Sequence, residues 1–134
     1  PFASVQNNIL LPLRFAPDRA NRVPSPVREA ERLCRDLGLP RDMMGARAGT
    51  LSVGQQQRVA AARALIGTPP LIVADEPTSS LDAATQVAFL DVLFAQSRNH
   101  STTVLMVSHD ARLSDQFDRV IQMVDISQTM RDAA

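Results

Sequence analysis

The apolar run from Leu71 to Ala74, which ends in the carboxylates Asp75 and Glu76, constrains the fold more than any other stretch. A short, continuous apolar run of this kind predicts a parallel strand that is covered on both faces, because such strands lie between layers of helices. Pro69 and Pro70 interrupt the chain immediately before the run. In open α/β sheets, ligands bind outside the carboxyl ends of the strands. The run therefore predicts an α/β fold with a ligand site at Asp75 and Glu76.

A long, alanine-rich helix is predicted just before this strand, beginning after Ser52 and reaching Leu65. Ser52 is a favoured N-cap residue, and the residues that follow it are good helix formers. Gly54 is a small residue in the first turn of this helix. The free N–H groups and the positive dipole end of such a helix start can bind an anion. The start of this helix is therefore a second candidate for ligand contact.

Four motifs occur in order along the chain. They are Leu51-Ser52-Val53-Gly54-Gln55, the strand ending in Asp75-Glu76, the loop Ser80-Leu81-Asp82, and Val107-Ser108-His109-Asp110. In their order and separations these motifs resemble those of ABC-type ATPases, the nucleotide-binding subunits of ATP-driven transporters. The sequence departs from the family at Val53, where the commonest signature motif has glycine. A β-branched residue at the first helical position costs little, so we expect the motif to stay functional.

The resemblance implies the fold and its division. The expected fold class is α/β, a partial P-loop NTPase core of the RecA-like, ABC type with parallel strands, joined to an α-helical subdomain. The helical subdomain that bears the signature motif is expected over residues 1–67, and the C-terminal half of the ATPase core over residues 68–134. Residues 4–13 are similar to a segment in exporters of the lipoprotein-release and macrolide-export type. A length of 134 residues suits one domain with a modest core.

The chain contains no lysine, since all fourteen basic residues are arginines. Phosphate-binding loops of the form G-x-x-x-x-G-K-[ST] need a lysine on the β/γ-phosphates and a hydroxyl on magnesium. None of the five glycines opens such a loop, and the first residue is Pro1 rather than methionine. We therefore expect a C-terminal piece of a longer ATPase whose first half carries the phosphate loop. The piece by itself is expected to be inactive.

Local patterns predict the remaining elements. They are a polar loop over residues 17–26, a helix capped by Ser25 and ended by Gly38, a short irregular or helical connector over 41–50, a helix over 83–97, strands over 102–107 and 119–124, a short helix over 110–117, and a solvated tail from Ser127. The expected inward faces of the two longer helices are Val27, Ala30, Leu33, Cys34 and Leu37 on the first, and Val87, Leu90, Leu93 and Phe94 on the second. Alternating strands and helices predict a parallel sheet, with the strand over 102–107 buried.

The resemblance implies roles for the polar residues at the strand ends. Asp75 would bind Mg²⁺, a hard cation that prefers carboxylates and water. Glu76 would be the general base for the water that attacks the γ-phosphate of ATP. His109 would stabilise charge on that phosphate and help to place the water. The alternative for Asp75 and Glu76 is a solvated strand end, and His100, which has no such context, is expected to be a surface residue.

Ser52, Gly54, Gln55 and Asp82 would meet the nucleotide across a subunit interface. In this family two nucleotide-binding domains dimerise head to tail, and the signature motif faces the ATP held by the partner's phosphate loop. Asp82 resembles the loop aspartate that crosses the same interface. For Ser52 a plain helix cap is the alternative, and both roles can hold together.

Several other residues are expected to be structural. They are Arg58 and Arg63 as pairing residues on the signature helix, Thr78, Ser79 and Ser80 as turn residues, Met43 and Met44 as core filler, and Cys34 as a packed helix residue.

The function implied by the resemblance is ATP hydrolysis that drives transport, with ATP and Mg²⁺ as cofactors. The implied partners are a second nucleotide-binding subunit and a transmembrane permease, which places the protein peripherally at the cytoplasmic face of the membrane. Two alternatives remain: a soluble ABC protein acting in translation or repair, and a catalytically dead interaction module. The net charge is zero, so nothing favours a nucleic-acid partner.

Overall fold

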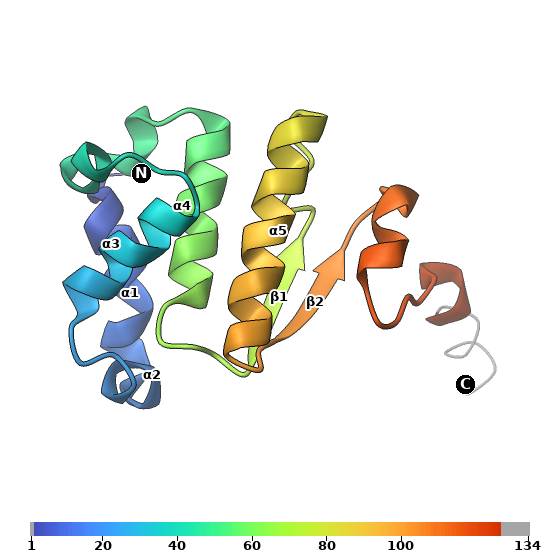
Figure 1. The fold of residues 1–134 in the computed structure, drawn as a ribbon, viewed down its shortest axis with the longest axis horizontal. Helices are drawn as coiled ribbons and strands as arrows, with labels where there is room; N and C mark the ends of the chain where they lie inside the picture. Colours follow the sequence, from blue (N-terminus) through green and yellow to red (C-terminus); the bar gives the residue numbers. More distant parts are fainter. Residues whose placement is uncertain (1, 127–134) are drawn as a thin grey trace.

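The computed structural model describes residues 2–126, which form a group of helices beside a small parallel sheet (Figure 1). In chain order the elements are α1 (Val5–Phe15), α2 (Pro17–Asn21), α3 (Pro26–Asp36), the 3₁₀ helices η1 (Arg41–Gly45) and η2 (Ala48–Thr50), α4 (Val53–Leu65), β1 (Leu71–Asp75), α5 (Ala83–Asn99), β2 (Thr103–Val107) and η3 (Ala111–Gln116). The expected tail from Ser127 lies outside the described residues. None of the helices in the described part of the chain has the length and apolarity needed to span a bilayer.

One apolar core joins the helices to the sheet. Its largest fully buried side chains are Val5 and Ile9 from α1, Leu33 from α3, Ile66 at the end of α4, and Leu90 from α5. Helix α4 contacts α1, α3 and α5, and therefore lies at the centre of the structure (Figure 1). Because the signature motif opens α4, its position is fixed by this core.

The predicted start of α4 is confirmed. The Ser52 side chain accepts a hydrogen bond from the Gln55 backbone N–H at 3.3 Å, and the Ser52 N–H donates to Gln55 Oε1 at 3.0 Å. This reciprocal capping box satisfies two of the backbone donors near the helix start. Val53 is the first helical residue, as expected.

The prediction of a loop over residues 17–26 is partly wrong, because this segment contains helix α2. Pro17 occupies the first helical position, where its fixed φ angle suits a helix. The negative charge of Asp18 in the first turn interacts favourably with the positive end of the helix dipole. Arg19 then donates to the carbonyls of Ala64 (2.8 Å) and Ile66 at the end of α4. Gly67 has a φ of 72°, and a Cβ there would lie 2.8 Å from the Arg19 carbonyl oxygen, so only glycine fits.

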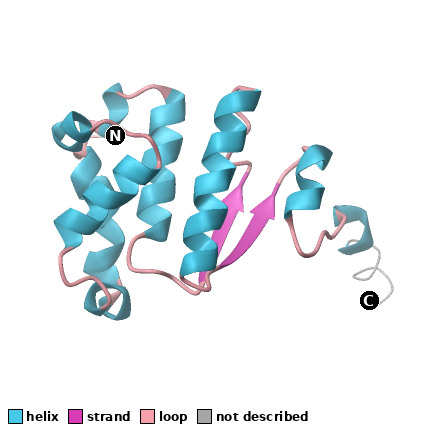
Figure 2. Ribbon diagram, viewed as in Figure 1, coloured by secondary structure: helices cyan, strands magenta, loops and turns pink. Residues whose placement is uncertain are grey.

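The two strands are parallel, with Leu71 opposite Thr103 and Asp75 opposite Val107. Helix α5 runs between them in sequence and covers one face of the sheet (Figure 2). The carboxyl ends of both strands therefore lie at the same edge.

The strands were predicted to be buried, and this is wrong for most of their side chains. Ile72 is buried, but Leu71, Val73, Leu105 and Val107 have between 46 and 64 % of their surface exposed. The reason is that α5 covers only one face of these strands (Figure 2).

The prediction of a third strand over residues 119–124 is also wrong. Residues 119–122 have no regular structure, and residues 123–126 form a helical turn. A strand needs a neighbour that supplies hydrogen bonds. Within residues 2–126 the sheet consists of β1 and β2 alone, and neither strand pairs with residues 119–124.

Two residues that were predicted to lie on the inward faces of helices are exposed instead. Val27 and Val87 are 42 % and 56 % exposed, whereas Phe89 is buried and takes the inward position on α5. The buried face of α5 is rotated because this helix packs against α4 as well as the sheet. Ser25 precedes α3 without a capping side-chain hydrogen bond. Cys34 is buried as expected, and its desolvation raises the pKa of the thiol to about 11.

We expect the chain by itself to associate with further copies. Leu71, Val73, Leu105 and Val107 form an exposed apolar sheet face, and exposed strand edges present unpaired N–H and C=O groups. Light scattering on the purified chain should show species larger than a monomer. A variant carrying Val73→Glu and Leu105→Glu should associate less, and a monodisperse monomer of the unmodified chain at high concentration would contradict the prediction.

Candidate functional site

The carboxyl ends of β1 and β2 bring together Asp75, Glu76 and His109, which we call the strand-end cluster. The His109 ring nitrogen Nδ1 lies 2.7 Å from Glu76 Oε1. The His109 backbone N–H donates to the same oxygen at 2.9 Å. Because both strands end at one edge, residues 33 positions apart in the sequence make direct contact.

The backbone of Glu76 is held in a strained conformation. Its φ is 45°, in the left-handed region that non-glycine residues seldom adopt. Such a residue costs about 1–3 kcal/mol and persists only when its surroundings hold it. Here the Glu76 N–H donates to the Val107 carbonyl at 2.9 Å, while His109 binds the carboxylate. The residue is therefore held both at its backbone and at its carboxylate, and strain of this kind is common at functional sites.

Neighbouring charges set the protonation of the cluster. The hydrogen bond that the His109 ring makes to the Glu76 carboxylate raises the pKa of His109 above its ordinary value, although the His109 side chain is 78 % exposed. Next to it, the hydrogen bonds from Arg112 hold the pKa of Asp110 well below its usual range. Arg112 binds both carboxylate oxygens, with Nε 2.8 Å from Oδ1 and one terminal nitrogen 2.7 Å from Oδ2. Asp110 is thus a fixed anion beside a histidine that favours its charged form.

Asp75 is exposed at the end of β1. Within residues 2–126, no group of three or more His, Cys, Asp or Glu side chains could hold a metal ion. Mg²⁺ is typically bound in nucleotide sites by one or two carboxylates together with phosphates and water. A single accessible carboxylate therefore fits a magnesium ion that arrives with a nucleotide, and does not fit a metal held by the protein alone.

The start of α4, residues 52–55, forms the second group of predicted site residues. We call it the signature turn. Ser52 and Gln55 bind one another in the capping box, so neither side chain points freely into solvent. The backbone N–H groups of Val53 and Gly54 make no hydrogen bond within the described residues. Free N–H groups at a helix start are suited to binding an anion.

Asp82 is the N-cap residue of α5. Its carboxylate accepts hydrogen bonds from the Thr85 backbone N–H at 3.0 Å and from the Thr85 hydroxyl at 2.6 Å. These bonds, the hydroxyl bond first, lower the pKa of Asp82 below its ordinary value. Asp82 is therefore an exposed and ionised side chain held in one orientation.

The first two turns of α4, which include the signature turn, pack against the loop before Asp82. Gln57 Nε2 donates to Ser80 Oγ at 2.6 Å, and a Cβ on Gly54 would lie 3.3 Å from Leu81 Cδ2. Gly54 therefore allows the loop to approach the helix closely. Ser80 and its neighbours Thr78 and Ser79 are turn residues, as predicted.

The structure does not bring all the predicted site residues together. Within residues 2–126, no hydrogen bond or ion pair joins the signature turn to the strand-end cluster. The signature turn contacts the loop before Asp82, and Glu76 contacts His109. One chain thus presents two separate sets of polar groups.

The sequence analysis missed Gln86 and Arg112, which both hydrogen-bond to Asp110 next to the strand-end cluster. Gln86, in the first turns of α5, donates through Nε2 to Thr78 Oγ1 at 3.1 Å and to Asp110 Oδ2 at 3.3 Å. An isolated glutamine on an amphipathic helix gives no sequence signal, because such amides usually face water. Only the packing of α5 against the sheet shows its partners.

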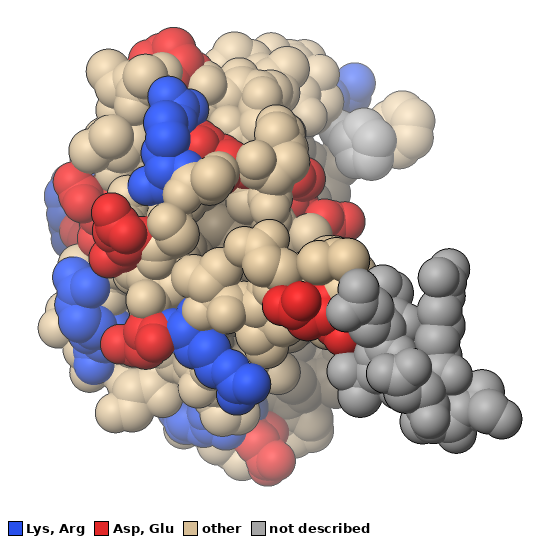
Figure 3. Space-filling view, turned by 90° about the vertical axis from the view of Figure 1, so that its right-hand side faces the viewer, with Lys and Arg blue, Asp and Glu red and all other residues tan. Residues whose placement is uncertain are grey.

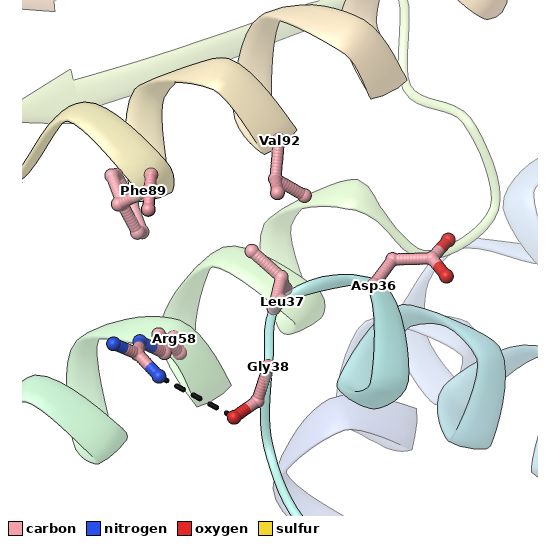
Figure 4. A pocket seen from close by; sticks show the side chains of 7 residues that line it. Asp36, Leu37, Gly38, Arg58, Phe89 and Val92 are labelled. Atoms are coloured by element: carbon pink, nitrogen blue, oxygen red, sulfur yellow. Dashed lines mark hydrogen bonds between the residues drawn. The ribbon is translucent and has the colours of Figure 1, made fainter. Parts of the chain in front are cut away.

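A small pocket of about 150 Å³ lies between the end of α3, α4 and α5, away from both groups (Figure 4). Its lining includes the apolar side chains of Leu37, Phe89 and Val92 and the charged side chains of Asp36 and Arg58. An Arg58 guanidinium nitrogen lies 3.4 Å from the Gly38 carbonyl oxygen. Arg58 therefore makes a structural contact, as predicted.

The surface around the sheet carries mixed charge. Seen from the side of the C-terminal segment, Arg, Asp and Glu side chains are scattered among uncharged residues, and neither sign dominates that face (Figure 3). His100 is exposed before β2, as predicted for a surface residue.

Comparison with known proteins identifies the family. The family model described as ABC transporter matches residues 1–79. The chain is 40 % identical over 125 residues to the lipoprotein-releasing system ATP-binding protein LolD of Anaeromyxobacter dehalogenans, covering 93 % of this chain and 51 % of that protein. It is 35 % identical over 125 residues to the macrolide export ATP-binding/permease protein MacB of Rhodopirellula baltica, covering 93 % of this chain and 18 % of that protein.

A solved structure supports the same assignment. The dimeric structure of MJ0796, a bacterial ABC transporter cassette, superposes with a TM-score of 0.71 at 30 % identity, covering 86 % of this chain and 50 % of that one. The chain thus spans about half the length of LolD and of this cassette. The predicted α/β fold class, part of a P-loop NTPase core with parallel strands and helices, is confirmed. The chain belongs to the ABC transporter family.

Proposed function

We propose that this chain forms the part of an ABC transporter ATP-binding subunit that carries the signature motif and the catalytic base. The complete subunit would hydrolyse ATP at the interface of a head-to-tail dimer and drive transport through a membrane permease. The observation that carries this proposal is the strained Glu76, whose carboxylate is held by His109 beside the accessible Asp75.

Glu76 acts as the general base. Its carboxylate accepts the proton of the attacking water, and a positioned base of this kind contributes about 10² to 10⁴ in rate. His109 holds the carboxylate through two contacts to Oε1, which leaves Oε2 available to accept the proton of the water. The raised pKa of His109 favours a positive charge close to the phosphate. Asp75 would hold Mg²⁺, which neutralises charge on the phosphates when bound.

The signature turn acts on a nucleotide held by the other subunit. The free N–H groups of Val53 and Gly54 and the positive end of α4 would bind its γ-phosphate, while Ser52 and Gln55 hold the turn in shape. Asp82 would cross the same interface. The separation of the signature turn from the strand-end cluster supports an arrangement in which the two groups of one chain act at two different nucleotide sites.

The domain organisation we propose separates the helices that precede residue 68 from the two strands and the helices that follow it. Residues 1–67 form the helical subdomain and residues 68–134 form half of the ATPase core. The partners are a second copy of the subunit and a permease, which would hold the protein at the cytoplasmic face of the membrane. The relatives named for lipoprotein release and macrolide export support a role in export.

We expect the chain by itself not to bind ATP. It has no lysine and no phosphate-binding loop, so the strand-end cluster has nothing to hold a nucleotide in place. Calorimetry with millimolar Mg-ATP should give no saturable heat. A complete cassette that includes this sequence is the matched control and should bind ATP. Micromolar binding to the chain alone would contradict the prediction.

A further inference from the structure

The side-chain amide of Gln86 connects the loops that follow the two strands. Thr78 lies two residues after Glu76, and Asp110 lies immediately after His109. Gln86 Nε2 is 3.1 Å from Thr78 Oγ1 and 3.3 Å from Asp110 Oδ2, so its two hydrogens can serve one loop each. No other side chain in the described part of the chain hydrogen-bonds to both loops.

The surroundings make this bridge rigid. Thr78 is 4 % exposed, so its hydroxyl has little access to water and depends on a protein partner. Asp110, whose side chain is 16 % exposed, is anchored from the other side by the two bonds from Arg112. Gln86 itself is half-buried on α5, which packs on the sheet. All three members of the bridge are therefore held by their own elements.

We propose that Gln86 is a positioning residue. It sets the separation between the loop after β1, which begins with Glu76, and the loop after β2, which contains His109, and it thereby holds the Glu76–His109 contact. The contact itself is exposed, and His109 is mostly in water. The bond from the Glu76 N–H to the Val107 carbonyl holds the first residue of one loop, and Gln86 adds a side-chain connection between Thr78 and Asp110 farther along the two loops. The catalytic consequence rests on the proposed function, whereas the structural consequence does not.

The structural test uses the chain itself. Gln86→Met keeps the length of the side chain and removes both donors. Hydrogen exchange at the His109 amide, which donates to Glu76, should rise about tenfold, the size of one lost hydrogen bond. Exchange in β1 and α5 should stay unchanged. Gln116→Met is the matched control, because it removes an exposed amide from the segment after Asp110 without touching the bridge.

A second variant tests the bridge as a unit. Thr78→Val removes one acceptor, so alone it should raise His109 exchange, and combined with Gln86→Met it should add nothing further. Unchanged exchange at His109 in Gln86→Met would overturn the proposal. A uniform rise across β1, β2 and α5 would also overturn it, because Gln86 would then support the fold in general.

The catalytic test uses a complete cassette. Gln86→Met should lower kcat about tenfold with KM for ATP unchanged, since a small displacement of a catalytic group affects the reaction rather than binding. If exchange at His109 rises but kcat does not fall, Gln86 is not a positioning residue for the reaction. If the unmodified cassette hydrolyses no ATP, the proposed function fails, and the exchange result still decides whether Gln86 holds the two loops.

Discussion

Replacing Glu76 with glutamine is expected to lower the rate of ATP hydrolysis by a complete cassette about 10²- to 10⁴-fold, the contribution of a positioned general base. Glutamine has the same size, and its oxygen can still accept the bonds from His109. Nucleotide should therefore still bind, and because ATP would bridge two subunits in the proposed dimer, the variant should accumulate as an ATP-dependent dimer. Phosphate release and size-exclusion chromatography with ATP are the measurements.

The matched control for this variant is Glu31→Gln on the exposed face of α3, which makes the same chemical change far from the strand ends. It should leave both rate and oligomeric state unchanged. Hydrolysis by Glu76→Gln at a rate near that of the unmodified cassette would show that another group takes the proton.

Replacing Ser52 with arginine is expected to abolish the ATP-dependent dimer while each monomer still binds ATP. The new side chain places bulk and charge at the signature turn, which faces the nucleotide of the other subunit in the proposed arrangement. Nucleotide binding by the monomer should be unchanged, because within residues 2–126 no hydrogen bond or ion pair joins the signature turn to the strand-end cluster. Equilibrium binding of ATP and sedimentation with ATP separate these effects.

Ser52→Ala is the control for loss of the helix cap alone. Removing the bond between Ser52 Oγ and the Gln55 N–H should cost about 1 kcal/mol of stability without adding bulk. This variant should still dimerise with ATP. A Ser52→Arg monomer that cannot bind ATP would show that the signature turn acts within its own chain.

The local features of the site could be predicted from the sequence because they depend on short-range chemistry. The capping of α4 by Ser52, the end of β1 at Asp75 and the turn over residues 78–80 are each determined by a few neighbouring residues. The meeting of Glu76 and His109 also follows from the sequence, because parallel strands end at one edge.

Features that depend on neighbouring elements could not be predicted in the same way. The burial expected for Val73 and Leu105 and the third strand over residues 119–124 both require further layers or strands, and these are absent from residues 2–126. The prediction that Val87 faces inward was wrong, because the rotation of α5 about its axis depends on its packing against both α4 and the sheet. Gln86 was missed for the same reason, since its partners come from two distant loops.

The division of one chain between two nucleotide sites is tested most directly by mixing Ser52→Arg and Glu76→Gln cassettes and measuring ATP hydrolysis. In a head-to-tail dimer, each site combines the Ser52 of one chain with the Glu76 of the other. The mixed dimer therefore has one site with both defects and one site with neither. Hydrolysis well above that of either variant alone is the expected result. A mixture no more active than its components, under conditions where mixed dimers form, would contradict the proposed arrangement.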